Sequence, residues 1–219
     1  MPLLEVSDLQ VCLPTARGVA CAVRGVGFTL ERGDTLGLIG ESGCGKSMTA
    51  LALLGLLPDG ASVTGSIRFD GQELVGLPDA ALQRLRGNRI GMVFQEPMTA
   101  LNPLHRIGRQ VAEPLRRHRG LGARAAEREA IALLERVGLP DAAQRMGAYP
   151  HQFSGGQRQR ITIAMALACG PDLLIADEPT TALDVTLQQQ ILDLIASLVA
   201  ERGMALVLIS HDLAVIAQN

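Results

Sequence analysis

Residues 40–47 of the chain read Gly40-Glu41-Ser42-Gly43-Cys44-Gly45-Lys46-Ser47 and match the phosphate-binding loop pattern G-x-x-x-x-G-K-[ST] at every fixed position. The apolar segment Thr35–Ile39 predicts a buried strand, and residues 48–57, rich in Ala and Leu, predict a helix. Glycines allow successive backbone N–H groups to point at phosphate oxygens, and the positive end of the helix faces the same anion. Lys46 can reach the terminal phosphates, and the Ser47 hydroxyl can ligate Mg²⁺. The segment therefore predicts a strand, a phosphate-binding loop and a helix in succession.

Composition limits the classes of protein that need to be considered. The 219 residues, 47% of them hydrophobic, are enough for one large domain with a full core. The formal net charge is -2 with interspersed charges, and aromatic residues make up only 2%, so nucleic-acid binding is not expected. Residues 1–5 lack the features of a signal peptide, and no apolar run reaches the length of a membrane span. If the protein works at a membrane, another chain supplies the spans.

The cysteines predict a reduced protein. Their spacing indicates neither a disulfide pair nor a metal site for the four residues Cys12, Cys21, Cys44 and Cys169. A cytosolic location is the simplest interpretation of this usage. Cys44 lies inside the phosphate-binding loop, either as a site open to oxidation or simply as a small residue.

Strand-like and helix-like segments alternate along the chain. Alternation of apolar and polar residues over 4–13 and 19–30, split by a turn over 14–18, predicts a hairpin. Further strands are expected at residues 66–70, 90–94, 172–176 and 205–210, and helices over about 79–86 and after Asp184. Asp184 can cap the last of these helices, whose shared apolar face consists of Leu187, Ile191, Leu194, Ile195 and Leu198. This order predicts an α/β fold with a mostly parallel sheet.

Residues 106–168 have a different sequence pattern, in which Arg and Glu are spread between Ala and Leu and no strand-like run occurs. We read this region as a helical insert within the α/β core. The expected organisation is a single domain over residues 1–219. Its α/β core comprises residues 1–95 and 171–219, and its helical subdomain covers about 96–170.

Several polar residues follow predicted strands directly. The phosphate-binding loop, Gln95, the pair Asp177-Glu178 and His211 all stand at such positions. Ligands of open parallel sheets bind along the edge where the strands end, so these residues are expected to converge. We assign Asp177 to Mg²⁺ and Glu178 to the general base, because neighbouring side chains on a strand point to opposite sides. A solvated turn is the alternative interpretation of this acidic pair.

The sequence Ser154-Gly155-Gly156-Gln157 opens another predicted helix. Ser154 is a residue typical of helix caps, and the glycines expose backbone N–H groups that could bind an anion. Arg158 and Arg160 lie in the first turn, where positive charge opposes the helix dipole, a placement that makes sense if a phosphate arrives there. An ordinary capped helix is the alternative.

Taken together, the order of these motifs resembles the ATP-binding cassette (ABC) ATPases, from about Leu3 to the last residue. The resemblance implies a P-loop NTPase cassette with antiparallel N-terminal strands and ATP held between two cassettes. One cassette contributes the phosphate-binding loop and the other contributes Ser154, Gly155, Gly156 and Gln157. It further implies catalytic roles for Glu178, Gln95 and His211, Mg²⁺ ligation by Ser47, Gln95 and Asp177, and communication across the dimer by Asp184.

Three segments resemble more closely the dipeptide, oligopeptide and nickel importer group: residues 94–103, 149–153 and 176–185. This group includes tandem-cassette proteins whose first half looks similar. The resemblance implies a peripheral ATPase at the cytoplasmic face of a bacterial inner membrane. It would power uptake of peptides or related solutes through two permease subunits, docked near residues 94–109 and supplied by a periplasmic solute-binding protein.

The sequence is also compatible with other functions. A soluble ABC ATPase acting on DNA would carry a long coiled coil, and none is present, whereas a ribosomal one would carry two cassettes and a basic linker. A regulatory nucleotide switch is a third class. Within the importer group, nickel and glutathione remain alternatives to peptides.

Two departures from the family pattern lead to further expectations. Leu13 stands where cassettes usually carry an aromatic residue that stacks on adenine. The chain also ends at Asn219, soon after the strand at Ala205–Ser210, so a truncated cassette is expected. Such a truncation would leave an exposed apolar sheet edge next to that strand.

Overall fold

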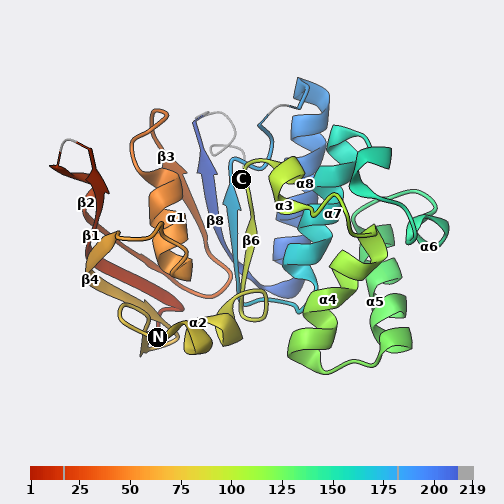
Figure 1. Ribbon diagram of the computed structural model, residues 1–219, viewed down its shortest axis with the longest axis horizontal. Coiled ribbons are helices and arrows are strands. Elements are labelled where there is room, and N and C mark those ends of the chain that lie inside the picture. Colours follow the sequence, from red (N-terminus) through yellow and green to blue (C-terminus); the bar gives the residue numbers. More distant parts are fainter. Residues whose placement is uncertain (17, 182, 212–219) are drawn as a thin grey trace.

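The computed structural model describes residues 1–16, 18–181 and 183–211 (Figure 1). Its strands are β1 Leu4–Thr15, β2 Gly18–Leu30, β3 Thr35–Ile39, β4 Ser62–Phe69, β5 Gln72–Glu73, β6 Ile90–Val93, β7 Leu173–Asp177 and β8 Ala205–Ser210. Its helices are α1 Lys46–Leu54, α2 Asp79–Leu85, α3 Pro97–Ala100, α4 Ile107–Arg119, α5 Ala123–Arg136, α6 Ala142–Arg145, α7 Gly155–Leu167 and α8 Val185–Arg202, with a 3₁₀ turn at Pro150–Gln152. Among the described residues, no helix combines the length and apolarity needed to cross a membrane.

The strands form two separate sheets. An antiparallel sheet has the order β2-β1-β4-β5, and a parallel sheet has the order β3-β8-β7-β6. Helices α3 to α7 lie together on one side of the parallel sheet, and α1 lies between the two sheets (Figure 1). The predicted α/β class with antiparallel N-terminal strands and a helical region is therefore confirmed, while the exact domain boundaries stay a prediction.

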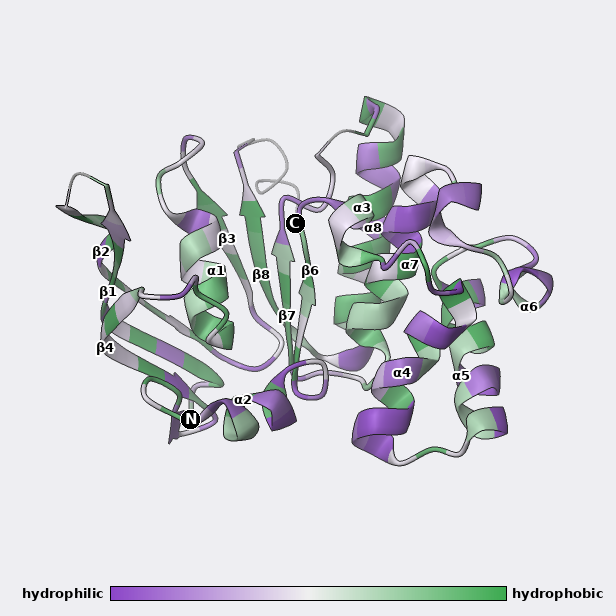
Figure 2. Cartoon of the chain, viewed as in Figure 1, coloured by the Kyte–Doolittle hydropathy of each residue, from purple (hydrophilic) through white to green (hydrophobic). Residues whose placement is uncertain are grey.

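The parallel sheet separates two hydrophobic cores. Along β7, Leu173 and Ile175 belong to the core shared with α1 and the antiparallel sheet. Leu174 and Ala176 belong to the core shared with α7, α8 and the helical region. This alternation follows from the period of two in a strand, and strands buried on both faces read as continuous apolar runs. Figure 2 shows the hydrophobic colouring along β7 and β8.

Helix α1 begins and ends earlier than predicted. The expected range was 48–57, whereas the helix covers Lys46–Leu54. It ends there because Gly55 adopts a left-handed conformation with φ 61°, and its N–H bonds the Ala52 carbonyl. The earlier start has a functional consequence, since Lys46 and Ser47 become the first residues of the helix.

The expected exposed edge next to Ala205–Ser210 is wrong. Strand β8 lies between β3 and β7 and pairs with both, and all six of its residues are buried. Among the described strands, β3 and β6 stand at the two edges of this sheet. Parallel strands are joined by crossovers, so a strand's place along the chain does not reveal its place in the sheet.

The prediction of four unpaired cysteines is also wrong. Cys12 and Cys21 form a disulfide between β1 and β2, with Cα atoms 3.9 Å apart. The two strands of the hairpin extend further than predicted, because Thr15 and Gly18, both expected in the 14–18 turn, already face one another. Counting back along both strands from that pair brings Cys12 opposite Cys21. Cys44 and Cys169 are the free thiols of the described chain.

Gly91 marks a close approach between sheet and helix, which we expect a small substitution to disturb. A Cβ atom at this position would lie 2.5 Å from the Ala166 carbonyl oxygen of α7. Gly91→Ala should therefore lower the free energy of unfolding by about 1–3 kcal/mol, as overpacking does in other cores. Urea unfolding measures this change. Gly147→Ala is the control, because no atom lies within 4 Å of its added Cβ. Equal stability of the two variants would show that α7 moves aside freely.

Candidate functional site

The phosphate-binding loop is shaped by contact with the edge strand of the antiparallel sheet. Gly45, the residue that caps α1, has φ 97°, and a Cβ atom there would lie 2.3 Å from the carbonyl oxygen of Ala22 in β2. Gly43 also has a positive φ, of 83°. Only glycine accommodates both the backbone conformation and the close approach at residue 45. The pattern predicted this glycine, but the role of Ala22 became visible only in the structure.

Lys46 reaches back over the loop. Its Nζ donates to the carbonyl oxygens of Gly40 at 2.6 Å and Glu41 at 3.0 Å. The ammonium group is thereby held at the mouth of the loop, next to the N-terminus of α1. A compact cation in this position suits the terminal phosphates of a nucleotide.

Two hollows border the loop. The larger, of about 550 Å³, is lined by Cys21, Ala22, Val23, Arg24, Val26, Leu38, Ile39, Gly43, Cys44, Gly45, Lys46 and Thr49. The smaller, of about 160 Å³, is lined by Ala22, Ser42, Gly43, Gly45, Lys46, Ser47, Met48, Gln95 and Glu178. The first hollow offers mostly apolar walls and the second gathers polar groups, so the loop lies between two chemically different spaces. Leu13 lines neither of them and instead faces Ala20 across the hairpin.

Ser47 and Asp177 come together at the smaller hollow. The Ser47 hydroxyl donates to Asp177 Oδ1 at 3.1 Å, joining the first turn of α1 to the last residue of β7. Asp177 is buried, and burial raises the pKa of its carboxyl, although the Ser47 hydrogen bond lowers that pKa to a lesser extent. A carboxylate oxygen and a hydroxyl oxygen converging on one point are ligands that Mg²⁺ prefers. These two residues therefore fit the predicted metal.

Glu178 stands just beyond β7, with its side chain 13% exposed. Its Oε2 accepts from Gln95 Nε2 at 2.9 Å and from Thr181 Oγ1 at 3.0 Å, and it lies 3.4 Å from His211 Nδ1. The backbone at Glu178 has φ 45°, a conformation that is uncommon outside glycine and frequent at active sites. This turn, rather than alternation along the strand, sets the direction of the side chain.

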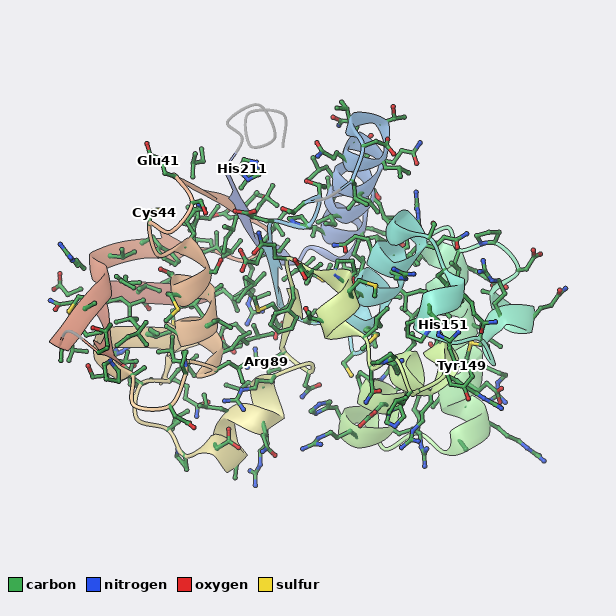
Figure 3. The ribbon with its side chains drawn as sticks, turned by 45° about the horizontal axis from the view of Figure 1, so that its top comes forward. Glu41, Cys44, Arg89, Tyr149, His151 and His211 are labelled. Carbon is green, nitrogen blue, oxygen red and sulfur yellow. A yellow bond between two sulfur atoms is a disulfide. The ribbon has the colours of Figure 1, made fainter. Side chains whose placement is uncertain are left out.

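The structure thus gathers Gln95, Glu178 and His211, which the sequence predicted would converge. In Figure 3, Glu41, Cys44 and His211 lie in the upper part of the view, and Arg89 lies below them. Thr181 was missed, although its hydroxyl lies three residues after Glu178, a spacing that a tight turn brings within reach.

The helix start at Ser154 has the predicted cap but lies apart from the loop. Ser154 Oγ accepts from the Gln157 N–H at 3.3 Å, and Gln157 Oε1 accepts from the Ser154 N–H at 3.2 Å. Within the described chain, none of residues 154–157 lines either hollow beside the loop. A single chain therefore does not bring these two predicted anion sites together.

Arg158 and Arg160 bond to carbonyl groups of neighbouring segments, and the phosphate contact suggested by the sequence stays a prediction. Arg158 Nε donates to the Pro150 carbonyl at 2.8 Å, and Arg160 donates to the Val137 carbonyl at 2.7 Å. Both guanidinium groups fasten α7 to neighbouring segments of the helical region. Asp184 caps α8 as predicted, because its carboxylate accepts from the Leu187 N–H at 3.0 Å.

Residues 23–181 match the family described as "ABC transporter". The oligopeptide transport ATP-binding protein OppD of Haemophilus influenzae is 53% identical over 216 residues, which cover 99% of this chain and 67% of that protein. The dipeptide transport ATP-binding protein DppD of Bacillus subtilis is 51% identical over 218 residues, which cover 99% and 65%. The chain thus spans about two thirds of the length of these relatives.

Solved structures share the fold. A dimeric ATP-binding cassette in a post-hydrolysis state, bound to ADP and Pi, superimposes with a TM-score of 0.84 at 29% identity, covering 97% of this chain and 89% of that one. The cassette cbiO1 of Clostridium perfringens, part of the ABC transporter complex cbiONQ, gives a TM-score of 0.79 at 26% identity, covering 99% and 81%.

Proposed function

The chain belongs to the ABC transporter family, and we propose that it is the ATP-hydrolysing subunit of an importer for oligopeptides or dipeptides. The observation that carries this proposal is the convergence of Ser47, Asp177, Gln95 and Glu178 beside the phosphate-binding loop. The peptide-transport names of the relatives favour peptides over nickel or glutathione as cargo.

In the proposed mechanism, the backbone N–H groups of the loop and the Lys46 ammonium bind the phosphates of ATP. Ser47 and Asp177, together with Gln95, would hold Mg²⁺, which neutralises negative charge on the phosphates when bound. Glu178 accepts a proton from the attacking water, and Gln95 and Thr181 keep its carboxylate in place. The Nδ1 atom of His211 lies 3.4 Å from Glu178 Oε2, so His211 is suited to contact the terminal phosphate.

A complete site would need a second cassette. Residues 154–157 expose a capped helix start suited to an anion but line neither hollow next to the loop. A partner cassette, identical or different, would supply this helix start across a dimer interface, with Asp184 near the same junction. The dimeric state of the similar ADP-bound cassette supports this arrangement.

The permease would dock on the face formed by α3 and the segment before α4. A groove of about 250 Å³ between the sheet and the helical region is bordered by Leu56, Phe94 and Met165, among others. On the face formed by α3 and the segment before α4, Met98 is 56% exposed and Leu104 is 81% exposed. Exposed apolar residues around a groove suit a protein partner. Two permease subunits at the cytoplasmic face of the bacterial inner membrane, served by a periplasmic solute-binding protein, complete the proposed importer.

Leu104→Asp tests this function in cells whose own copy of the gene has been deleted. A charge on the proposed docking face should reduce co-purification with the permease and uptake of a labelled tripeptide by at least tenfold, while ATP binding by the purified protein is unchanged. Val19→Asp, at an equally exposed position of the β1–β2 hairpin, is the control and should transport normally. If the wild-type protein neither co-purifies with a permease nor restores uptake, the importer assignment is wrong.

A further inference from the structure

Cys12 and Cys21 lie opposite one another in the β1–β2 hairpin and are disulfide-bonded. The flanking pairs Leu13–Ala20 and Val11–Val23 hold the two strands together independently of the sulfur atoms. Both cysteines are half-buried, so small thiols and disulfides can approach them. The hairpin therefore keeps the two sulfur atoms within bonding reach in either oxidation state.

The disulfide lies next to an irregularity in the ladder. Val11 faces Val23 and Cys12 faces Cys21, so Ala22 is an extra residue on β2, with no opposite partner. A bulge of this kind bends its strand and redirects the local backbone. The redirected residue is the one whose carbonyl oxygen approaches Gly45 of the phosphate-binding loop. The disulfide at Cys21 thus restrains the residue directly before Ala22, the bulged residue that contacts the loop.

The same segment forms a wall of the larger hollow. Cys21 and Ala22 line it together with Gly45 and Lys46, and Arg24 Nε donates to the Cys21 carbonyl at 3.1 Å. Strand β2 stands at the edge of its sheet, where β1 is its neighbour among the described strands. Strand β1 is held from its other side by β4, with Cys12 facing Ser62. The disulfide therefore adds a covalent link between the edge strand β2 and the internal strand β1.

We propose that Cys12 and Cys21 form a reversible redox pair that sets nucleotide affinity, with the disulfide form binding ATP more tightly than the dithiol form. This inference rests on the proposed binding of ATP at the loop. The disulfide holds the bulge in the position that packs against Gly45, so less ordering remains to be done when the nucleotide binds. Reduction releases that constraint on the edge strand and weakens binding.

The oxidant that balances the reaction is a low-molecular-weight disulfide such as glutathione disulfide. One cysteine thiolate attacks it, forming a mixed disulfide and releasing one glutathione thiolate, which takes up the proton lost by the cysteine. The second cysteine, as a thiolate, then attacks the protein sulfur of the mixed disulfide. The protein disulfide forms, and a second glutathione leaves and takes up the second proton. Two cysteine sulfurs are oxidised while the two sulfurs of glutathione disulfide are reduced.

The test uses the full chain equilibrated in glutathione buffers of defined potential. Mass spectrometry of a non-reduced digest identifies which cysteines are bonded, and calorimetric titration with ATP measures affinity in each state. We expect the disulfide form to bind ATP about fivefold more tightly, at the lower end of couplings between sites. By reciprocity, saturating ATP should make the disulfide harder to reduce by the same factor, which shifts its midpoint potential by about 20 mV to more negative values.

Cys12→Ser and Cys21→Ser should each abolish the dependence of affinity on glutathione potential, whereas Cys169→Ser should retain it. Wild-type protein is compared with itself in two oxidation states, so the conclusion does not depend on whether a variant folds. The inference is overturned if no Cys12–Cys21 bond forms at any potential, or if both forms bind ATP equally. If neither form binds ATP, the proposed function fails as well, and the mapped disulfide distinguishes this outcome from the others.

Discussion

Glu178→Gln is expected to bind ATP with wild-type affinity and to hydrolyse it about a hundred to ten thousand times more slowly. The amide has nearly the same shape as the carboxylate, so the contacts that Gln95 and Thr181 make to this side chain can be approximated. An amide cannot accept a proton from water, and the general base is lost. Single-turnover hydrolysis of ATP, measured beside equilibrium binding, separates the two effects.

Glu129→Gln is the matched control for this variant, because it makes the same chemical change at an exposed position on α5. It should hydrolyse ATP at the wild-type rate. A Glu178→Gln protein that hydrolysed ATP normally would exclude Glu178 as the base. A protein that bound ATP poorly would instead show that the Glu178 carboxylate serves mainly to hold the site together.

Lys46→Ala and Ser154→Arg should each be nearly inactive alone, yet recover activity when mixed. The first change removes the charged contact to phosphate. The second removes the hydroxyl that caps α7 and places a bulky cation at the same helix start. In a mixed dimer, the intact loop of one chain meets the intact helix start of the other. Random pairing with independent sites predicts recovery of about a quarter of the wild-type ATPase rate.

The control mixture combines Lys46→Ala with the double variant Lys46→Ala/Ser154→Arg. Every dimer in that mixture lacks an intact loop, so no activity should return. Dimer formation is verified in both mixtures by analytical ultracentrifugation. If dimers form in the first mixture and its activity stays at the level of the single variants, the site is not shared between two chains.

Much of the site could be predicted because it rests on short-range physics. The loop at residues 40–47 and the caps at Ser154 and Asp184 depend on glycine conformations and on hydrogen bonds between residues three apart. Gln95, Glu178 and His211 could be placed together without knowledge of the strand order. Parallel strands all end at the same edge, whichever neighbours they have.

The features that escaped prediction depend on which distant segments pack together. Strand β8 lies in the middle of its sheet, although it looked like an edge, because crossover connections leave strand order to long-range packing. Arg158 and Arg160 bond carbonyls of neighbouring segments that no local pattern connects to α7. In each case the partner atoms belong to other segments of the chain, so a local sequence pattern could not reveal them.

In the phosphate-binding loop, features set by local sequence and features set by long-range packing lie within a few residues of each other. Its glycines and Lys46 are recognisable from spacing alone, since their roles come from backbone conformation and charge. The support of Gly45 by Ala22, and the disulfide of Cys21 beside it, come from a bulge in a hairpin whose register no motif records. A shift of one residue in the pairing would have placed a different residue of β2 against Gly45 and turned the Cys21 side chain to the other face. Only the assembled sheet therefore settles which atoms meet the loop.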